Sequence, residues 1–211
     1  MRNEEENIIT KNKTGNEIKN KTGKTYKLST PLSVSDINQL KTGDLVYISG
    51  KIYTARDEAH IRMKEYGDLK KPLPFETKGC VVYHCGPVIK DMKVVAAGPT
   101  TSDRMTNLTP GILKSGNIRA IIGKGGMKNL GDVMKENKCV YLSYTGGCAA
   151  LACDMIKSVS NVFWEDLGMA EAVWEFEVET FGPLIVGIDT CGNDLFLEVI
   201  KKATKVYESI K

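Results

Sequence analysis

The sequence predicts an α/β fold with a mostly parallel or mixed sheet and helices packed on it. Strand-like and helix-like segments alternate along the chain, which favours this class. Several strand-like segments, such as VVAAG at 94–98, AIIG at 120–123 and LIVGI at 184–188, are unbroken apolar runs, as expected of strands buried on both faces. The 211 residues, of which 42% are hydrophobic, are enough for one large domain.

The domain organisation follows from composition. Residues 1–24 are rich in Asn, Lys and Glu and poor in large apolar side chains, which predicts a disordered N-terminal extension. Residues 25–211 contain neither a linker nor a repeat, so we expect a single domain there. The sequence has neither the run of about 18 apolar residues of a membrane helix nor a signal peptide. We therefore expect a cytoplasmic protein without a membrane partner.

Eight strands are expected from apolar and β-branched runs. The segment WEFEVE alternates, with Trp174, Phe176 and Val178 on one face and glutamates on the other, which predicts an edge strand or a sheet face open to water. The expected strands are Thr25–Ser29, Asp44–Thr54, Gly79–His84, Val94–Ala97, Arg119–Ile122, Val140–Tyr144, Trp174–Glu179 and Leu184–Asp189.

Helices are expected between these strands. The last one carries apolar residues at helical spacing along one stripe, and Asn193 would cap its N-terminus. Thr109 followed by Pro110 predicts the start of another helix, with Thr109 as the N-cap and Pro110 as the first helical residue. The expected helices are 57–66, 110–115, 127–137, 149–158 and 193–209.

Charge and cysteine usage narrow the classes of function. The formal net charge is +3, and residues 1–24 carry +2 of it, so the rest of the chain is nearly neutral. This balance argues against a broad nucleic-acid surface, although it leaves room for a small anion site. The six cysteines include no C-x-x-C pair, so we expect reduced thiols and no metal site in this chain.

Cationic side chains follow three predicted strands. Arg56 separates a strand from a helix, Thr100 and Arg104 share one side of a turn after Gly98-Pro99, and Lys124 lies among glycines in IIGKGG. Ligand sites collect at strand ends in α/β folds. Three cations there would bind a small polyanion such as a dicarboxylate, with arginine gripping carboxylate oxygens in a fork.

Less specific interpretations stay open for each segment. Arg56 alone would more often be a solvated arginine, and residues 99–104 would often be an ordinary capped turn. The stretch IIGKGG also resembles the G-x-x-G loop of a KH RNA-binding module, which is an alternative function of another class. Cys148, near a predicted helix start, is given no role because no base accompanies it.

The segments KIYTARDEAH, GPTTSDRM, IIGKGGM and DLGMAEAVWEFEVETFGPLIVGIDTCGNDLF occur in this order. Together they resemble the iron–sulfur fumarate/tartrate hydro-lyases, and more narrowly the separate beta subunit, which equals the C-terminal domain of fused enzymes. The resemblance spans about residues 25–210. It implies a swivelling β/β/α domain whose active site is shared with an alpha subunit.

The resemblance also implies roles for single residues. Arg56, Arg104 and Lys124 would hold the carboxylates and hydroxyl of the substrate, and Thr100 would take part in acid–base chemistry with an Asp of the partner. A four-iron four-sulfur cluster would be bound by the partner alpha subunit, none by this chain, in an alpha2-beta2 assembly. Fumarate hydratase is the first expectation and L-tartrate dehydratase the alternative, and a non-catalytic assembly subunit is a further one.

Overall fold

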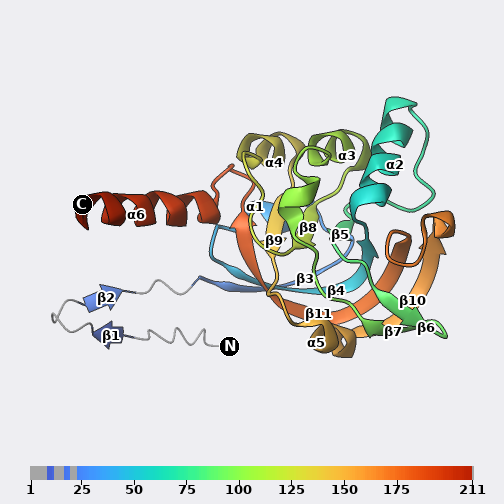
Figure 1. Cartoon of the computed structure of the whole chain (residues 1–211), viewed down its shortest axis with the longest axis horizontal. Coiled ribbons are helices and arrows are strands. Elements are labelled where there is room, and N and C mark those ends of the chain that lie inside the picture. Colours follow the sequence, from blue (N-terminus) through green and yellow to red (C-terminus); the bar gives the residue numbers. More distant parts are fainter. Residues whose placement is uncertain (1–8, 12–16, 20–22, 211) are drawn as a thin grey trace.

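The computed structural model describes residues 9–11, 17–19 and 23–210. It contains a seven-stranded mixed sheet with helices packed on it, which confirms the predicted α/β class (Figure 1). The strands of this sheet are β3 (Thr25–Ser29), β4 (Leu45–Thr54), β5 (Val81–Tyr83), β8 (Ala120–Gly123), β9 (Val140–Ser143), β10 (Ile156–Phe163) and β11 (Val173–Ile188).

Two small antiparallel sheets pair β1 (Ile9–Lys11) with β2 (Glu17–Lys19) and β6 (Val88–Lys90) with β7 (Lys93–Ala96). The rest of the predicted extension at 1–24 lies almost entirely outside the described residues. The helices are α1 (Val34–Asn38), α2 (Asp57–Asp68), α3 (Thr109–Gly116), α4 (Gly131–Asn137), α5 (Ala149–Met155) and α6 (Leu195–Ile210), with short 3-10 helices η1 (Ser102–Met105) and η2 (Glu165–Leu167).

The large sheet is parallel through its middle and closed by one antiparallel strand. Strands β3, β4, β5, β8 and β9 are parallel neighbours in that order. β11 pairs antiparallel with β9 and also with β4, so β4, β5, β8, β9 and β11 form a closed ring. The carboxyl ends of the parallel strands therefore meet at one edge, where the predicted site residues lie.

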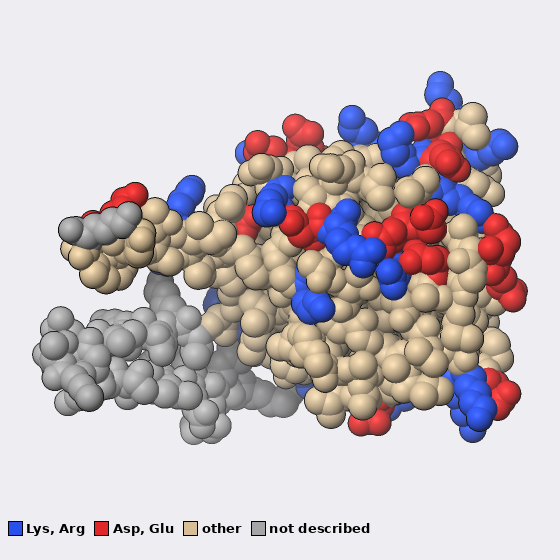
Figure 2. All heavy atoms as spheres, in the orientation of Figure 1, with Lys and Arg blue, Asp and Glu red and all other residues tan. Residues whose placement is uncertain are grey.

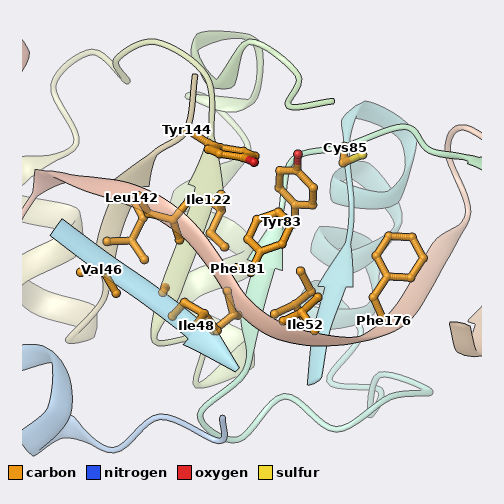
Figure 3. Close-up of a cluster of buried hydrophobic side chains, with 14 of the residues drawn as sticks. Val46, Ile48, Ile52, Tyr83, Cys85, Ile122, Leu142, Tyr144, Phe176 and Phe181 are labelled. Atoms are coloured by element: carbon orange, nitrogen blue, oxygen red, sulfur yellow. The ribbon is translucent and has the colours of Figure 1, made fainter. Parts of the chain in front are cut away.

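Both faces of the central strands are buried, and their residues alternate between two cores. In β5, Val81 and Tyr83 enter one core and Val82 the other; in β8, Ala120 and Ile122 alternate with Ile121 in the same way. This explains the unbroken apolar runs in the sequence. The first core contains Tyr83, Phe181 and Tyr144, whose rings pack with centroids 5.2 Å apart for both pairs involving Phe181 (Figure 3). Helices α2, α3 and α4 cover the second core.

Three predicted segments form strands, but their setting in the fold differs from the prediction. The segments Trp174–Glu179 and Leu184–Asp189 belong to one strand, β11, which is central rather than an edge, and its Glu175 is only 7% exposed beside Lys51. The predicted strand Val94–Ala97 is not buried, since β7 lies outside the main sheet in a hairpin with β6.

Helix boundaries also needed correction. The predicted helix 149–158 ends at Met155, where the chain turns into edge strand β10, and the predicted helix 127–137 begins only at Gly131. Thr109 does not cap α3; its hydroxyl donates to the Met105 carbonyl. Asp194, not Asn193, accepts hydrogen bonds from the first amides of α6.

Helix α6 has the predicted apolar stripe but does not bury it against the sheet. It projects from the body, and Val199, Ile200, Val206 and Ile210 are more than half exposed (Figure 1). Only its first turn packs closely, where Phe196 lies against Gly126 and Gly187. No helix among the described residues is long and apolar enough to cross a membrane.

Candidate functional site

Arg56 lies where β4 ends and α2 begins. It is the N-cap residue of α2 with extended backbone, and its side chain makes no capping hydrogen bond, so the guanidinium is directed elsewhere. Its Nε lies 2.8 Å from Glu171 Oε1 and 3.3 Å from Asp57 Oδ2. A side chain at Gly86 would lie 2.8 Å from Arg56 Nη1, so glycine there keeps the space that the guanidinium fills.

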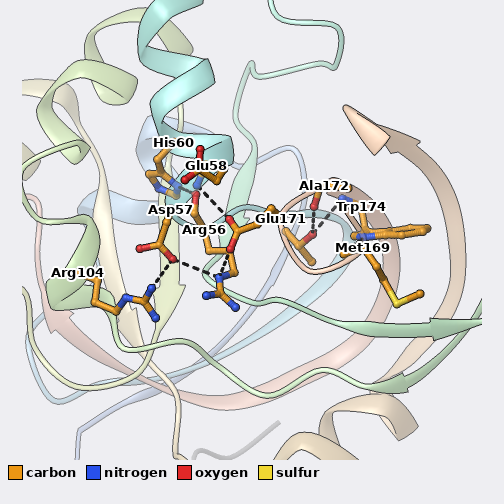
Figure 4. Close-up of polar contacts among 10 residues, drawn as sticks. Arg56, Asp57, Glu58, His60, Arg104, Met169, Glu171, Ala172 and Trp174 are labelled. Atoms are coloured by element: carbon orange, nitrogen blue, oxygen red, sulfur yellow. Dashed lines mark hydrogen bonds and ion pairs between the residues drawn. The ribbon is translucent and has the colours of Figure 1, made fainter. Parts of the chain in front are cut away.

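Asp57 joins the two arginines of the site. The same Oδ2 atom that faces Arg56 lies 2.9 Å from Arg104 Nη2, although the two arginines are 48 positions apart in the chain (Figure 4). Glu171 adds a second link, because its Oε2 accepts from the Glu58 amide in the first turn of α2. We call Arg56, Asp57, Arg104 and Glu171 the charged rim.

Thr100 and Lys124 are brought together by their backbones. The Thr100 amide donates to the His84 carbonyl over 2.7 Å, and the Lys124 amide donates to the Thr100 carbonyl over 3.1 Å. The Ser102 amide then donates to the Lys124 carbonyl. The Lys124 side chain extends over Gly146, whose added Cβ would lie 3.0 Å from Lys124 Cδ. The loop after β8 thus pairs with the segment that leads into η1.

All four predicted site residues therefore lie at one edge of the sheet. Arg104 is on η1, two residues after the segment that pairs with Lys124, and its side chain reaches Asp57 beside Arg56. Asp103, the acid that lies next to Arg104 in sequence, is occupied elsewhere: its carboxylate pairs with Lys128 at 2.9 Å, which lowers its pKa. The arrangement offers cations and one hydroxyl to an anion with more than one carboxylate.

Sequence reasoning missed the two acidic members of the charged rim. Asp57 was noted only as the start of a helix, and Glu171 was not considered. An acid directly after the arginine was the available signal for Asp57. Glu171 comes from a loop 115 positions away, so only the tertiary structure identifies it.

Two buried histidines lie beneath the rim. His60 Nδ1 is 2.9 Å from the Arg56 carbonyl, and His84 Nδ1 is 2.9 Å from Ser102 Oγ. The ring centroids are 4.9 Å apart in an edge-to-face arrangement. Burial lowers the pKa of His60 to about 4 and that of His84 well below its ordinary value of 6.5, so both rings are neutral at pH 7.

The cysteines do not form a cluster site within the described residues. All six are free, and no group of three or more His, Cys, Asp or Glu side chains in that part of the chain could hold a metal ion. Burial raises the pKa of Cys139 to about 12 and raises those of Cys80 and Cys85 as well, which keeps these thiols protonated. These three thiols therefore pack as neutral side chains of the core.

The surface around the site is mixed in charge. Figure 2 shows Lys and Arg side chains interspersed with Asp and Glu side chains on this face rather than gathered in one broad basic area. This distribution agrees with the near-neutral composition. It does not favour the KH-like alternative, which would need a positive surface along a nucleic-acid strand.

Comparisons with known proteins agree on one family. A family model described as "Fumarase C-terminus" matches residues 1–199. The chain is 47% identical over 185 residues to "Putative L(+)-tartrate dehydratase subunit beta" of Methanocaldococcus jannaschii, covering 85% of this chain and 93% of that one. It is 36% identical over 176 residues to "L(+)-tartrate dehydratase subunit beta" of Escherichia coli, covering 81% and 86%.

A longer relative matches the same region. The chain is 38% identical over 191 residues to "Putative fumarate hydratase class I" of Geobacillus stearothermophilus. That match covers 87% of this chain and 36% of the longer protein.

Proposed function

The chain belongs to the Fumarase C-terminus family, and on that premise we propose that it is the beta subunit of a hydro-lyase for a small dicarboxylate. The observation that carries the proposal is the convergence of Arg56, Thr100, Arg104 and Lys124 at one edge of the sheet. The names of the separate relatives imply an alpha subunit as partner. The chain would then supply half of an active site.

The three cations suit the chemistry of adding water across a double bond between two carboxylates. The proton that moves is attached to a carbon beside a carboxylate and is barely acidic, so negative charge builds up on that carboxylate in the transition state. Arginines fixed around it stabilise that charge and orient the substrate. We assign Arg56 and Arg104 to the carboxylates and Lys124 to a carboxylate or hydroxyl oxygen.

The charged rim is built to aim these arginines. Asp57 and Glu171 both contact Arg56 through Nε, which holds the guanidinium plane while Nη1 lies near Gly86. Because Asp57 also contacts Arg104, the guanidinium groups of Arg56 and Arg104 are held near each other before substrate binds. Preorganised cations of this kind lose little conformational freedom on binding.

Thr100 is proposed as the group that handles a proton. Its amide donates a hydrogen bond to the His84 carbonyl, and its carbonyl accepts one from the Lys124 amide, so its backbone is fixed on both sides. A threonine hydroxyl is a poor base by itself, so a carboxylate from the alpha subunit would assist it. We also assign the four-iron four-sulfur cluster to the alpha subunit, in a cytoplasmic alpha2-beta2 assembly.

Fumarate is the substrate that we propose first, with (S)-malate as the product. L-tartrate dehydration is the second candidate, favoured by the names of the two separate beta-subunit relatives. Both reactions involve four-carbon dicarboxylates, so the two arginines serve either. The difference lies in one hydroxyl group.

Anaerobic co-expression with the proposed alpha subunit tests the proposal. Steady-state rates on fumarate, (S)-malate and L(+)-tartrate would identify the substrate, and iron analysis of each purified chain would locate the cluster. We expect activity only from the complex and iron only in the alpha subunit. A cluster in stoichiometric amount on this chain alone would contradict the division of labour, and a complex inactive on all three substrates would contradict the function.

A further inference from the structure

A series of buried hydrogen bonds lies beneath Thr100 and Lys124. The Tyr141 hydroxyl lies 2.7 Å from the Gly125 carbonyl and 3.0 Å from Ser102 Oγ. Tyr141 is the donor toward both oxygens, and Ser102 Oγ also lies within hydrogen-bond distance of His84 Nδ1, at 2.9 Å. The three side chains are therefore linked to one another and to the loop at Gly125.

The three side chains of this series are completely buried. Ser102, His84 and Tyr141 have no exposed surface. A side chain at Gly123 would overlap Ser102 Oγ and lie 3.1 Å from His84 Nδ1, so glycine at this position makes room for the series. The serine hydroxyl thus occupies the space between β8 and the segment that leads into η1.

The series fastens both loops that carry candidate site residues. Tyr141 holds Gly125 next to Lys124, and Ser102 belongs to the same turn as Thr100. The His84 backbone adds to this, since its carbonyl accepts from the Thr100 amide and its own amide donates to Ile122 at the end of β8. The relative placement of Thr100 and Lys124 therefore depends on side chains that neither contact solvent nor reach the rim.

A second arm reaches Arg56. His60 Nδ1 donates to the Arg56 carbonyl, and the His60 ring packs edge-to-face against His84 (Figure 4 shows His60 behind Arg56). Neither histidine Nε2 has a hydrogen-bond partner among the described residues. Apolar side chains would fill this space at lower cost if only stability were at stake, because buried polar atoms without partners are unfavourable.

We propose that His60, His84, Ser102 and Tyr141, the buried network, are positioning residues that hold Thr100, Lys124 and Arg56 in reactive register. The catalytic part of this inference rests on the proposed function. The network acts through the backbone of the loops, so its loss should lower kcat more than it raises KM. Displacement of reacting groups by about 1 Å can reduce a rate about 100-fold.

Tyr141→Phe in the assembled complex is the first test. It removes one oxygen and leaves the Ser102 hydroxyl and the Gly125 carbonyl without their partner. We expect kcat to fall about 10- to 100-fold with KM changed less than threefold. Tyr53→Phe is the matched control, because Tyr53 is also a largely buried strand tyrosine of the same core, with its hydroxyl beside Glu175 rather than the loops. Equal kcat for Tyr141→Phe and the control would overturn the proposal.

A pair of variants at His84 provides the rescue. Asn carries an amide nitrogen and oxygen on Cγ, as His carries Nδ1, so His84→Asn keeps a hydrogen-bond partner for Ser102, whereas His84→Leu has none. We expect most of kcat to survive in His84→Asn and at least tenfold more to be lost in His84→Leu at equal folded fraction. Similar losses in both would indicate a merely structural role and would overturn the proposal.

Hydrogen exchange on the full chain gives a readout that does not depend on the reaction. Tyr141→Phe should speed exchange at the amides of 100–102 and 123–126 by at least tenfold, while the amides of β4 stay as in the parent. Unchanged exchange in both segments would overturn the positioning role even in an active complex. If Tyr141→Phe speeds exchange but the parent complex has no hydro-lyase activity, the positioning role stands and the proposed function is rejected.

Discussion

The charged rim and the buried network lie on either side of the Arg56 backbone, yet they are built on different principles. In the rim, Arg104 is 52% exposed, and Arg56 and Asp57 are about a quarter exposed, so water screens their ion pairs. In the network, the groups are neutral, hydrogen-bonded and completely buried. Exposed ion pairs contribute only ~0–1 kcal/mol to stability, whereas loss of one member of a buried hydrogen bond costs about 1–3 kcal/mol.

This difference in exposure suits the rim to binding a ligand and the network to fixing the positions of the loops. Because the ion pairs of the rim stabilise the fold only slightly, its arginines can exchange a carboxylate of the protein for one of the substrate with little loss of stability. The network cannot move without uncovering unpaired polar atoms. We therefore expect substitutions in the rim to lower activity while leaving the free energy of unfolding nearly unchanged. Substitutions in the network should lower both.

The largest effect is expected at Arg104. Arg104→Ala should lower kcat/KM by roughly 30- to 1000-fold, the equivalent of ~2–4 kcal/mol for a charged hydrogen bond to the transition state. Arg104→Lys should do nearly as much harm, because a point charge does not reproduce a forked contact. Thermal unfolding should shift little in either variant, as its exposure predicts.

Arg62 supplies the control for this prediction. It makes a forked pair with Asp166, with both contacts shorter than 3 Å, away from Arg104. Arg62→Lys should leave kcat/KM within about twofold, since exposed pairs contribute little. Full activity in Arg104→Lys would show that the rim acts through charge alone.

Thr100 is partly exposed, as the rim residues are, yet its backbone amide donates to the carbonyl of His84 in the buried network. Thr100→Val keeps the shape and removes the hydroxyl, and kcat should fall by about 100-fold, within the range for a lost acid–base group. Thr100→Ser should retain measurable activity. Thr101→Val is the matched control, since Thr101 is the exposed neighbour with the same side chain. An unchanged kcat in Thr100→Val, with assembly intact, would remove Thr100 from the mechanism.

The smallest effect is expected in the pH dependence of stability. Burial lowers the pKa of both histidines below the ordinary 6.5, to about 4 for His60, so the unfolded chain binds protons more readily than the folded one. The free energy of unfolding should therefore be steady above pH 6.5 and fall as pH drops from there toward 4, by up to ~1.4 kcal/mol per unit per histidine.

Urea denaturation of this chain at pH 7.5, 6 and 5 measures that slope. The aspartates with lowered pKa titrate below the ordinary 3.8 and lie outside this window. His60→Leu should flatten the slope. A free energy of unfolding that stays constant from pH 7.5 to 5 would mean that the histidines are not buried as neutral rings.

Local patterns in the sequence predicted where residues of the candidate site lie in the fold, for a physical reason. Arg56 and Lys124 lie within two residues of the ends of β4 and β8, and parallel strands place their carboxyl ends at one edge, so their neighbourhood in space follows from position in sequence. Thr100 follows β7, which lies outside this sheet, and its backbone hydrogen bonds with His84 and Lys124 bring it to the same edge. The apolar run AIIG likewise predicted that β8 is buried on both faces, and the helix after Arg56 was predicted from its first residue.

The tertiary structure alone decided the contacts that make these residues a site. Residues 149–158 carry an apolar pattern that suits a helix or a strand, and only pairing with β11 converts their end into β10. The partners in the rim and the network are distant in sequence: Glu171 for Arg56, Asp57 for Arg104, and Tyr141 for Ser102. No local propensity encodes such pairs, because a side-chain hydrogen bond depends on where two separately formed elements come to rest in the folded core.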